Sequence, residues 1–321
     1  MMAEGIALTD LVFGAVKASS RKGRLLTNQQ LIDLAGSRDL KDLINRLKDK
    51  YPALSTVTPS LKEVEKALLK TYRDEVGDLV KIAPDLAPVL RMPIREVEGL
   101  QVIEALKAQL GIVSLENVEG QRRHGKEEAL AKFSSKGFAQ EVKDATDIFE
   151  KYKVPGLIDA VFARHRVLGL VNADTGIPDD VSEELKQYVR LKADMFNADI
   201  LLRGIQNGVD GRALAELVVS GGSMPHKLLQ EAVKQTDIRK VLALIEGAGL
   251  PKVDSARALE EYYESKILRM MSRTYYDGYL GAGAIMGYLE LKLRETRNIV
   301  RIANSISLGI DPKRIMQEFI F

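Results

Sequence analysis

The segment Leu289–Arg301, LELKLRETRNIVR, and the residues directly after it decide the fold class of this chain. Apolar side chains recur three or four positions apart, the spacing of one face of an α-helix, at Ile299, Ile302, Ile306 and Ile310. Gly309 is placed to end a helix in the left-handed conformation, and Asp311 and Pro312 are placed to cap and begin another. The stretch therefore predicts a long helix with a defined end.

This helix has an earlier copy over Leu191–Asn207, one hundred and one residues upstream. A weaker echo ends at Gly111. The matched positions in the two clear copies are Asp194 with Glu295, Asn197 with Asn298, and Gly208 with Gly309. Repetition of a helical segment implies that the chain is built from similar helical units.

Helix-start signals recur between these long helices. An acid followed by an apolar residue opens a short helical pattern at Asp39-Leu40, Asp147-Ile148 and Asp237-Ile238. Two capping boxes are predicted, at Thr27–Gln30 and Ser60–Glu63. The division that we expect is a leading helix over 1–23, helical units over 24–111, 112–208 and 209–309, and a helical tail over 310–321.

The composition favours an all-α protein and excludes several kinds of site. Aromatic residues are 6% and Trp is absent, whereas strand-rich folds use more aromatic and β-branched residues. The absence of Cys excludes disulfides and thiol nucleophiles, and three His make a His-based metal site unexpected. Lys+Arg (47) and Asp+Glu (45) nearly cancel, which gives no reason to expect nucleic acid. We expect neither a metal nor a cofactor.

No apolar run approaches the roughly 18–20 residues that a bilayer-spanning helix needs. Residues 1–9 carry acids and no basic segment, so a signal peptide is not expected. We expect a protein of the cytoplasm, unless it docks on a partner that is itself in a membrane.

Several motifs resemble functional sites but have a structural explanation. In the glycine run 278–287, Gly281 and Gly283 could begin a dinucleotide-binding turn, but no strand precedes them, and we interpret them as close contacts between helices. His165 is expected on the surface, and 121–126 is expected as a solvated loop, with contact to phosphates or lipid headgroups as the alternative. Acids that we interpret as a helix first turn rather than metal ligands are Asp179, Asp180, Glu183 and Glu184.

The acid–amide pairs are the more informative polar motif. Within each pair the two residues stand three apart, so they share a helix face. Asn is unfavourable inside a helix unless its side chain makes a specific contact. Either each Asn binds a neighbouring backbone and fixes the helix register, which we favour, or these faces meet a partner. The candidate structural or interface residues are Asp194, Asn197, Gly208, Gly281, Gly283, Glu295, Asn298 and Gly309.

At these residues the chain resembles the C subunit of the archaeal-type (A-type, also called V-type) rotary ATPase/ATP synthase, which is related to the d subunit of vacuolar ATPases. The resemblance covers essentially the whole length. It departs at Gly99, where the first copy is expected to carry an Asn, and in the polar region 116–138. The matching motifs are Arg24-Leu25-Leu26, Asp194-Met195-Phe196-Asn197, Gly287-Tyr288-Leu289 and Glu295–Ile302.

The resemblance implies three similar helical domains with pseudo-three-fold symmetry that form a funnel. It implies a monomeric protein without an active site, present in one copy per complex on the cytoplasmic face of the membrane. One side would receive the rotor shaft, made of the D and F subunits, and the other would sit on the membrane proteolipid ring. The implied function is torque transmission between proton or sodium flow and the catalytic head.

Two other classes of function stay open. One is a helical repeat scaffold that binds a partner protein, although units of about 90–100 residues are longer than HEAT or TPR repeats. The other is an enzyme or nucleic-acid module within a helical fold, which the scarcity of His, the absence of Cys and the small net charge disfavour.

Overall fold

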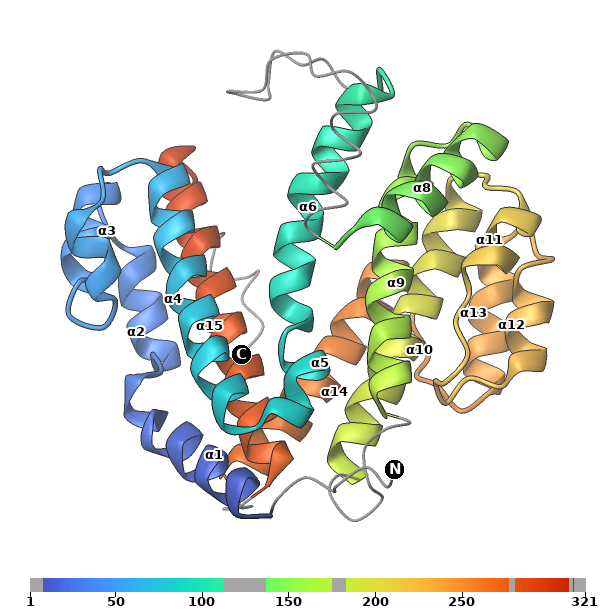
Figure 1. Ribbon diagram of the computed structural model, residues 1–321. Coiled ribbons are helices and arrows are strands. Elements are labelled where there is room, and N and C mark those ends of the chain that lie inside the picture. The colour runs from blue at the N-terminus through green and yellow to red at the C-terminus, as the bar shows by residue number, and fades with distance from the viewer. Residues whose placement is uncertain (1–7, 113–136, 175–182, 277–280, 312–313, 315–321) are drawn as a thin grey trace. The chain divides into compact units, whose positions relative to one another are not determined.

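The computed structural model describes residues 8–112, 137–174, 183–276, 281–311 and 314. The helical elements follow one another along these segments, and no β-strand occurs among the described residues, which confirms the predicted all-α class (Figure 1). The chain divides into two compact units, each discontinuous in sequence. Unit 1 comprises Met1–Arg91, Ile177–Leu185 and Glu264–Phe321, and unit 2 comprises Met92–Gly176 and Lys186–Tyr263.

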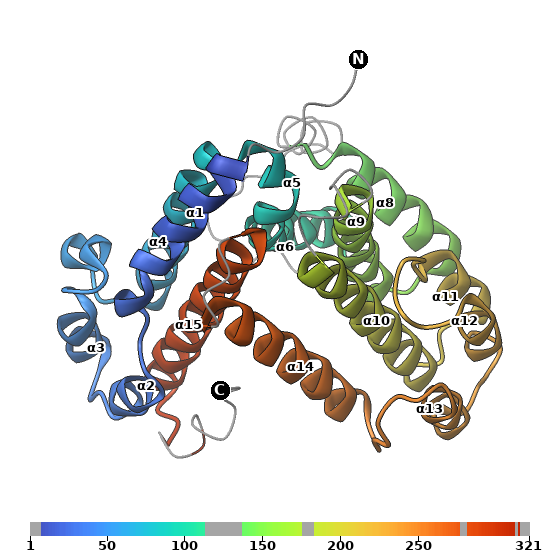
Figure 2. The same ribbon diagram turned by 90° about the horizontal axis from the view of Figure 1, so that it is seen from below.

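Unit 1 joins the N-terminal helices to the C-terminal one. Its elements are α1 (Leu8–Ser20), η1 (Lys22–Arg24), α2 (Asn28–Ala35), α3 (Leu40–Leu47), η2 (Pro52–Thr56), α4 (Leu61–Ile82), η3 (Pro84–Leu86), α5 (Ala87–Leu90) and α15 (Ala282–Ser307), with the later part of α14 (Ala256–Tyr276). The long helix α15 packs along α4 and also contacts α1, α2 and α3 (Figures 1 and 2). Their apolar side chains form one core that includes Leu43, Leu47, Leu54, Leu68, Ile299 and Ile302.

Helix α1 turns a different face inward from the one that its sequence pattern predicts. The pattern places Val16 on the apolar face with Leu11, but Val16 is 49% exposed, whereas Leu11, Ala15 and Ala18 are buried. The reason is the small size of the buried side chains. A β-carbon on Gly14 would lie 2.7 Å from Ile285, so α1 lies against α15 where a larger residue would not fit.

Unit 2 contains the helices from the middle of the chain. Its elements are α6 (Met92–Gln109), α8 (Ala139–Tyr152), α9 (Gly156–Asp174), α11 (Gly211–Leu217), α12 (His226–Ala232) and α13 (Ile238–Gly247), with most of α10 (Glu183–Gln206) and the first part of α14. Helix α9 packs against α6, α8 and α11. The shared core includes Val102, Leu106, Val142, Ile158, Phe162, Ala213 and Leu217.

The start of α8 differs from the prediction. The sequence pattern places a helix start at Asp147, but this residue lies inside α8, which begins at Ala139. Val142, Ala145 and Ile148 form its buried stripe, so the amphipathic pattern begins before the acid. The two other acids of this kind, Asp39 and Asp237, do cap the helices that follow them.

Candidate functional site

The buried polar side chains of α15 bind the N-terminal segment of the chain. The carboxylate of Glu295, a residue 5% exposed, accepts hydrogen bonds from the backbone N–H of Leu26 and from the hydroxyl of Tyr51. Lys292 donates to the same carboxylate over 2.7 Å. These contacts join positions more than two hundred residues apart in sequence, so Glu295 attaches the last long helix to the 26–51 segment.

Lys292 also contacts Tyr51 directly. Its Nζ lies 2.9 Å from the Tyr51 hydroxyl and 4.2 Å from the centre of the ring. Burial, and after it the charge of Glu295, raise the pKa of the Tyr51 phenol well above its usual value. Tyr51 therefore stays a neutral hydrogen-bond donor to Glu295, and the three side chains satisfy one another in the core.

A second polar cluster links α1, α4 and α15. Arg21, which is 8% exposed, lies 2.9 Å from Asp78 and 3.8 Å from Glu75. Tyr288 donates to the same Glu75. Arg21 directly follows the last residue of α1, and its charge is directed into unit 1 toward these two acids.

Asp194, the counterpart of Glu295 in α10, binds a loop of unit 2. Its two carboxylate oxygens accept the backbone N–H groups of Ser223 and Met224, each over 2.9 Å. A β-carbon on Gly222 would lie 2.1 Å from Asp194 Oδ1, so only glycine lets the loop approach this closely. Both acids of the repeat thus accept backbone N–H groups of a segment outside their own helix.

Asn197 binds the same loop one helix turn further on. Its Nδ2 donates to the carbonyl of Val219, and its Oδ1 accepts the N–H of that residue, each over 2.8 Å. The side chain is fully buried, and this pair of bonds holds the loop in one register along α10. Asn298 differs, because its Oδ1 is buried and has no hydrogen-bond partner in the described part of the chain.

In the first copy, the position expected to carry the repeated Asn is Gly99, and its surroundings are apolar. Gly99 is buried, and a β-carbon there would meet the rings of Phe162 and Phe138 at 3.6 and 3.8 Å. In unit 2 the fully buried Tyr263 lies near Asp194, whose charge is the second cause, after burial, of the raised pKa of this phenol.

The three long helices end in one shared motif. Gly111, Gly208 and Gly309 have φ of +70°, +69° and +66°. In each case the glycine N–H bonds the carbonyl three positions back, and the next N–H bonds the carbonyl five positions back. This is the Schellman arrangement, with an apolar residue after the glycine, and it satisfies carbonyls that the helix end leaves open.

The glycines at the start of α15 have different surroundings. A β-carbon on Gly283 would lie 2.4 Å from Thr274 Cγ2, and one on Gly287 would lie 2.6 Å from the carbonyl of Met271. Gly281 has no atom within 4 Å of such a carbon. Gly283 and Gly287 thus let α15 approach α14 inside unit 1, and Gly281 is not needed for that contact.

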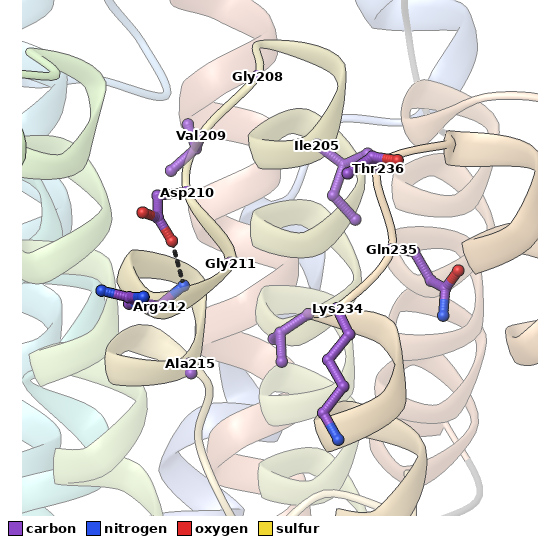
Figure 3. Close-up of a pocket in the computed structure, with 11 residues that line it drawn as sticks. Ile205, Gly208, Val209, Asp210, Gly211, Arg212, Ala215, Lys234, Gln235 and Thr236 are labelled. Atoms are coloured by element: carbon purple, nitrogen blue, oxygen red, sulfur yellow. Dashed lines mark hydrogen bonds between the residues drawn. The ribbon is translucent and has the colours of Figure 1, made fainter.

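One pocket of about 640 Å³ lies beside the helix-ending motif of α10 (Figure 3). Its walls are the 208–212 turn and the 233–236 segment. The carboxylate of Asp210 accepts the backbone N–H of Arg212 over 2.7 Å and is thus engaged in capping α11. The side chains of Arg212 and Lys234 point away from one another, so the pocket does not gather two positive charges at one point.

A family profile described as "ATP synthase (C/AC39) subunit" matches residues 15–318, nearly the whole chain. The chain belongs to this family. The relatives of this C/AC39 chain include proteins named as the C subunit of the A-type ATP synthase. The one from Pyrococcus abyssi is 23% identical over 92% of this chain and 86% of its own length. Those from Methanothermobacter thermautotrophicus and Thermococcus gammatolerans are 22% and 24% identical over 95% and 94% of this chain, and 86% and 87% of their own lengths.

The other motifs singled out in the sequence of this C/AC39 protein can be located wherever the structure describes them. His165, expected on the surface, has a side chain only 19% exposed that lies 2.8 Å from Asp144 of α8, because α8 packs over this part of α9. Glu183 and Glu184 are in the first turn of α10, whereas 121–126 and Asp179-Asp180 lie outside the described residues. Among the described residues, no group of three or more His, Asp or Glu side chains could hold a metal, and no helix is long and apolar enough to cross a membrane.

Sequence reasoning did not find Tyr51 and Lys292. Lys292 lies between two leucines on a helix whose exposed side is expected to be charged, so its burial has no local signal. Tyr51 stands directly before Pro52, and no helical period of its own marks it as buried. The one available indication is the spacing of three between Lys292 and Glu295, which places both on the same helix face.

Proposed function

We propose that this C/AC39 protein is a non-catalytic central-stalk component of a proton- or sodium-translocating rotary ATPase/ATP synthase. The single observation that carries the proposal is the family match over residues 15–318, because it extends through every helical unit rather than one domain. In this role the protein receives the tip of the rotor shaft, made of the D and F subunits, and rests on the proteolipid ring. It is peripheral to the membrane on the cytoplasmic side, with one copy per complex.

The packing of the long helices supports a mechanical role. A component that transmits torque must not shear between its helices under load. Glu295 and Lys292 attach α15 to Leu26 and Tyr51 through hydrogen bonds, and Asp194 attaches α10 to the 218–224 loop. Buried networks in which each group is satisfied make a body rigid and fix one packing arrangement.

The repeated helix ends support an arrangement of three similar units. The shared motif at Gly111, Gly208 and Gly309 marks the ends of α6, α10 and α15 at nearly equal sequence intervals. Three similar units around an axis would form a funnel whose socket fits the end of a helical shaft. The candidate residues that make such internal contacts would then fix the units: Asp194, Asn197, Gly208, Gly283, Glu295 and Gly309.

A bridging experiment tests the function. Immobilised D–F shaft is mixed with detergent-solubilised proteolipid ring, with or without this protein. We expect the ring to be retained only when the protein is present, with an all-α protein of similar size as the control. Retention of neither partner by the folded protein would overturn the proposal. Retention of one partner only would support the alternative, a helical scaffold for that partner.

A second readout separates coupling from simple assembly. In membranes that contain the complete complex, removal of this protein is expected to abolish ATP-driven ion pumping while the head retains ATP hydrolysis. Re-addition of the purified protein should restore pumping. Loss of hydrolysis by the isolated head upon removal would instead indicate a catalytic contribution.

A further inference from the structure

The pocket beside the helix-ending motif of α10 lies wholly within unit 2, and its buried part is apolar (Figure 3). Ile205 of α10 and Val233 of the 233–236 segment line it, and each is 8% exposed. Val209 lines it as well and is partly buried against the core of unit 2. The inner surface of the pocket therefore suits an apolar side chain rather than a charged one.

Two glycines in the 208–212 turn shape this space. Gly208 has φ of +69°, and a β-carbon there would meet no atom within 4 Å. At Gly211 the turn approaches the other wall, because a β-carbon would lie 2.2 Å from the carbonyl oxygen of Val233. The walls are thus close at one point and leave about 640 Å³ open beside it. Ligand pockets have volumes of roughly 300–1,000 Å³, so this space is large enough for a ligand.

The rim of the pocket is positively charged. Arg212 and Lys234 are both exposed, and neither forms an ion pair with an acid in the described part of the chain. Among the described residues that line the pocket, Asp210 is the one carboxylate, and it accepts the backbone N–H of Arg212 over 2.7 Å. The rim therefore offers two cations to an anionic partner, while its own acid is engaged in capping α11.

The direction of the two cations distinguishes between kinds of anion. The side chains of Arg212 and Lys234 extend away from one another (Figure 3). This arrangement does not suit a compact anion such as phosphate, because such an anion is held by positive groups that converge on it. A peptide segment suits it better, since its carboxylates can stand on either side of an apolar residue.

We propose that this pocket is a docking site for an acidic segment of a partner protein, in which an apolar side chain lies between two carboxylates. The apolar side chain enters the space beside Gly208, against Ile205 and Val233. The carboxylates bind Arg212 and Lys234 at the rim. The inference does not depend on the proposed function, because it rests on the walls and charges of a pocket inside unit 2.

A titration followed by NMR of labelled methyl groups in the full chain tests the site. The methyl groups of Ile205, Val209 and Val233 are reporters inside the pocket. Those of Ile299 and Ile302 report on the core of unit 1. The probe is a blocked hexapeptide with two leucines between two glutamates, and the matched control peptide has lysines in place of the glutamates. We expect shifts of the pocket methyl groups alone, with the acidic peptide alone. Shifts with neither peptide, or equal shifts with both, would overturn the proposal.

Charge substitutions at the rim test the two cations. Arg212→Gln/Lys234→Gln should weaken binding of the acidic peptide about five- to tenfold, since two exposed ion pairs are lost. Lys227→Gln/Lys240→Gln removes the same charge at exposed positions outside the pocket and should change the affinity by less than about twofold. Circular dichroism checks that both variants are folded.

Two results of this second experiment would overturn the proposal. Equal weakening by the two double variants would show an effect of net charge alone. Displacement of the peptide by millimolar inorganic phosphate, with the same pocket methyl groups shifted by phosphate alone, would assign the rim to a compact anion instead.

Discussion

Lys292 Nζ lies 2.7 Å from Glu295 Oε1 in the interior of unit 1, where the two side chains are 3% and 4% exposed. Breaking such a pair from one side leaves the other charge buried without its partner. Lys292→Met is therefore expected to lower the free energy of unfolding by about 3–5 kcal/mol, measured by urea denaturation at pH 7.

The control for this variant is an exposed ion pair. Arg257 and Glu261 have side chains that are 74% and 53% exposed, and Arg257→Met should cost less than about 1 kcal/mol. The double variant Lys292→Met/Glu295→Gln should be more stable than Lys292→Met alone, because no charge stays buried and the amide oxygen still accepts a hydrogen bond from the N-terminal segment. A Lys292→Met protein as stable as the original would refute the role of this pair.

The two repeated asparagines should respond differently to substitution. Asn197→Leu leaves the buried N–H and carbonyl of Val219 without partners, so the expected cost is about 2–4 kcal/mol. Asn298→Leu removes a buried oxygen that has no partner in the described part of the chain, so its cost should be below about 1 kcal/mol. Thermal unfolding of the two variants compares them, and equal losses would contradict this assignment.

The contact between α14 and α15 predicts that the loss of stability from one substitution is compensated by a second. Gly283→Ala places a carbon 2.4 Å from Thr274 Cγ2, and Thr274 is held in place because its hydroxyl bonds the carbonyl of Met270 over 2.9 Å. The expected cost is about 1–3 kcal/mol. Thr274→Ser removes the methyl group and keeps the hydroxyl. The double variant Gly283→Ala/Thr274→Ser should therefore regain most of the stability that Gly283→Ala loses. Gly281→Ala, in open space, is the control and should change stability little.

Replacing a helix-ending glycine with alanine should lower the stability, whereas the same substitution within a helix should raise it. Gly309 has φ of +66° with open space around a β-carbon, so Gly309→Ala carries a conformational cost of about 1–2 kcal/mol. Gly77 lies inside α4, also in open space, and Gly77→Ala should stabilise by about 0.5–1 kcal/mol. Denaturant midpoints measure both, and a change of the same sign in the two variants would be inconsistent with these conformations.

Tyr263 should contribute to alkaline unfolding. Burial, and then the charge of Asp194, raise the pKa of its phenol in the folded protein. Above about pH 10 the unfolded chain has lost this proton while the folded chain keeps it. Stability therefore falls as pH rises, by up to about 1.4 kcal/mol per pH unit. Tyr263→Phe should leave stability at pH 7 nearly unchanged, because the hydroxyl lacks a hydrogen-bond partner among the described residues, and should reduce the slope above pH 10. An unchanged slope would show that Tyr263 does not cause this loss of stability.

Local signals predicted much of the helical structure. The capping box at Thr27–Gln30 is present with both of its bonds. The one predicted at Ser60–Glu63 is half formed: Ser60 accepts the N–H of Glu63, but the Ser60 N–H bonds the carbonyl of Thr58. The left-handed conformation of Gly208 and Gly309 follows from a glycine placed directly after an apolar-periodic segment. These features depend on a few neighbouring residues, which is why a single sequence reveals them.

The polar interior could not be predicted in the same way. The sequence pairs Asp194 with Asn197, but the loop that they bind begins more than twenty residues later, at Val219. The bond between Tyr51 and Glu295 joins residues 244 positions apart. Both contacts depend on which helices become neighbours, and neither helix period nor capping carries that information. The predicted helix start at Asp147 is wrong because the buried stripe of α8 begins before this acid, at Val142.

The attachment of α15 to the N-terminal helices has a consequence for biosynthesis. Leu26 and Tyr51 leave the ribosome long before Glu295, so their partner is missing for most of translation. Residues 92–263 contain all of unit 2, together with Ile177–Leu185 of unit 1, and they are synthesised before the last helix. The first ninety residues must wait with part of their apolar surface uncovered, which makes the nascent chain a substrate for chaperones until synthesis is complete.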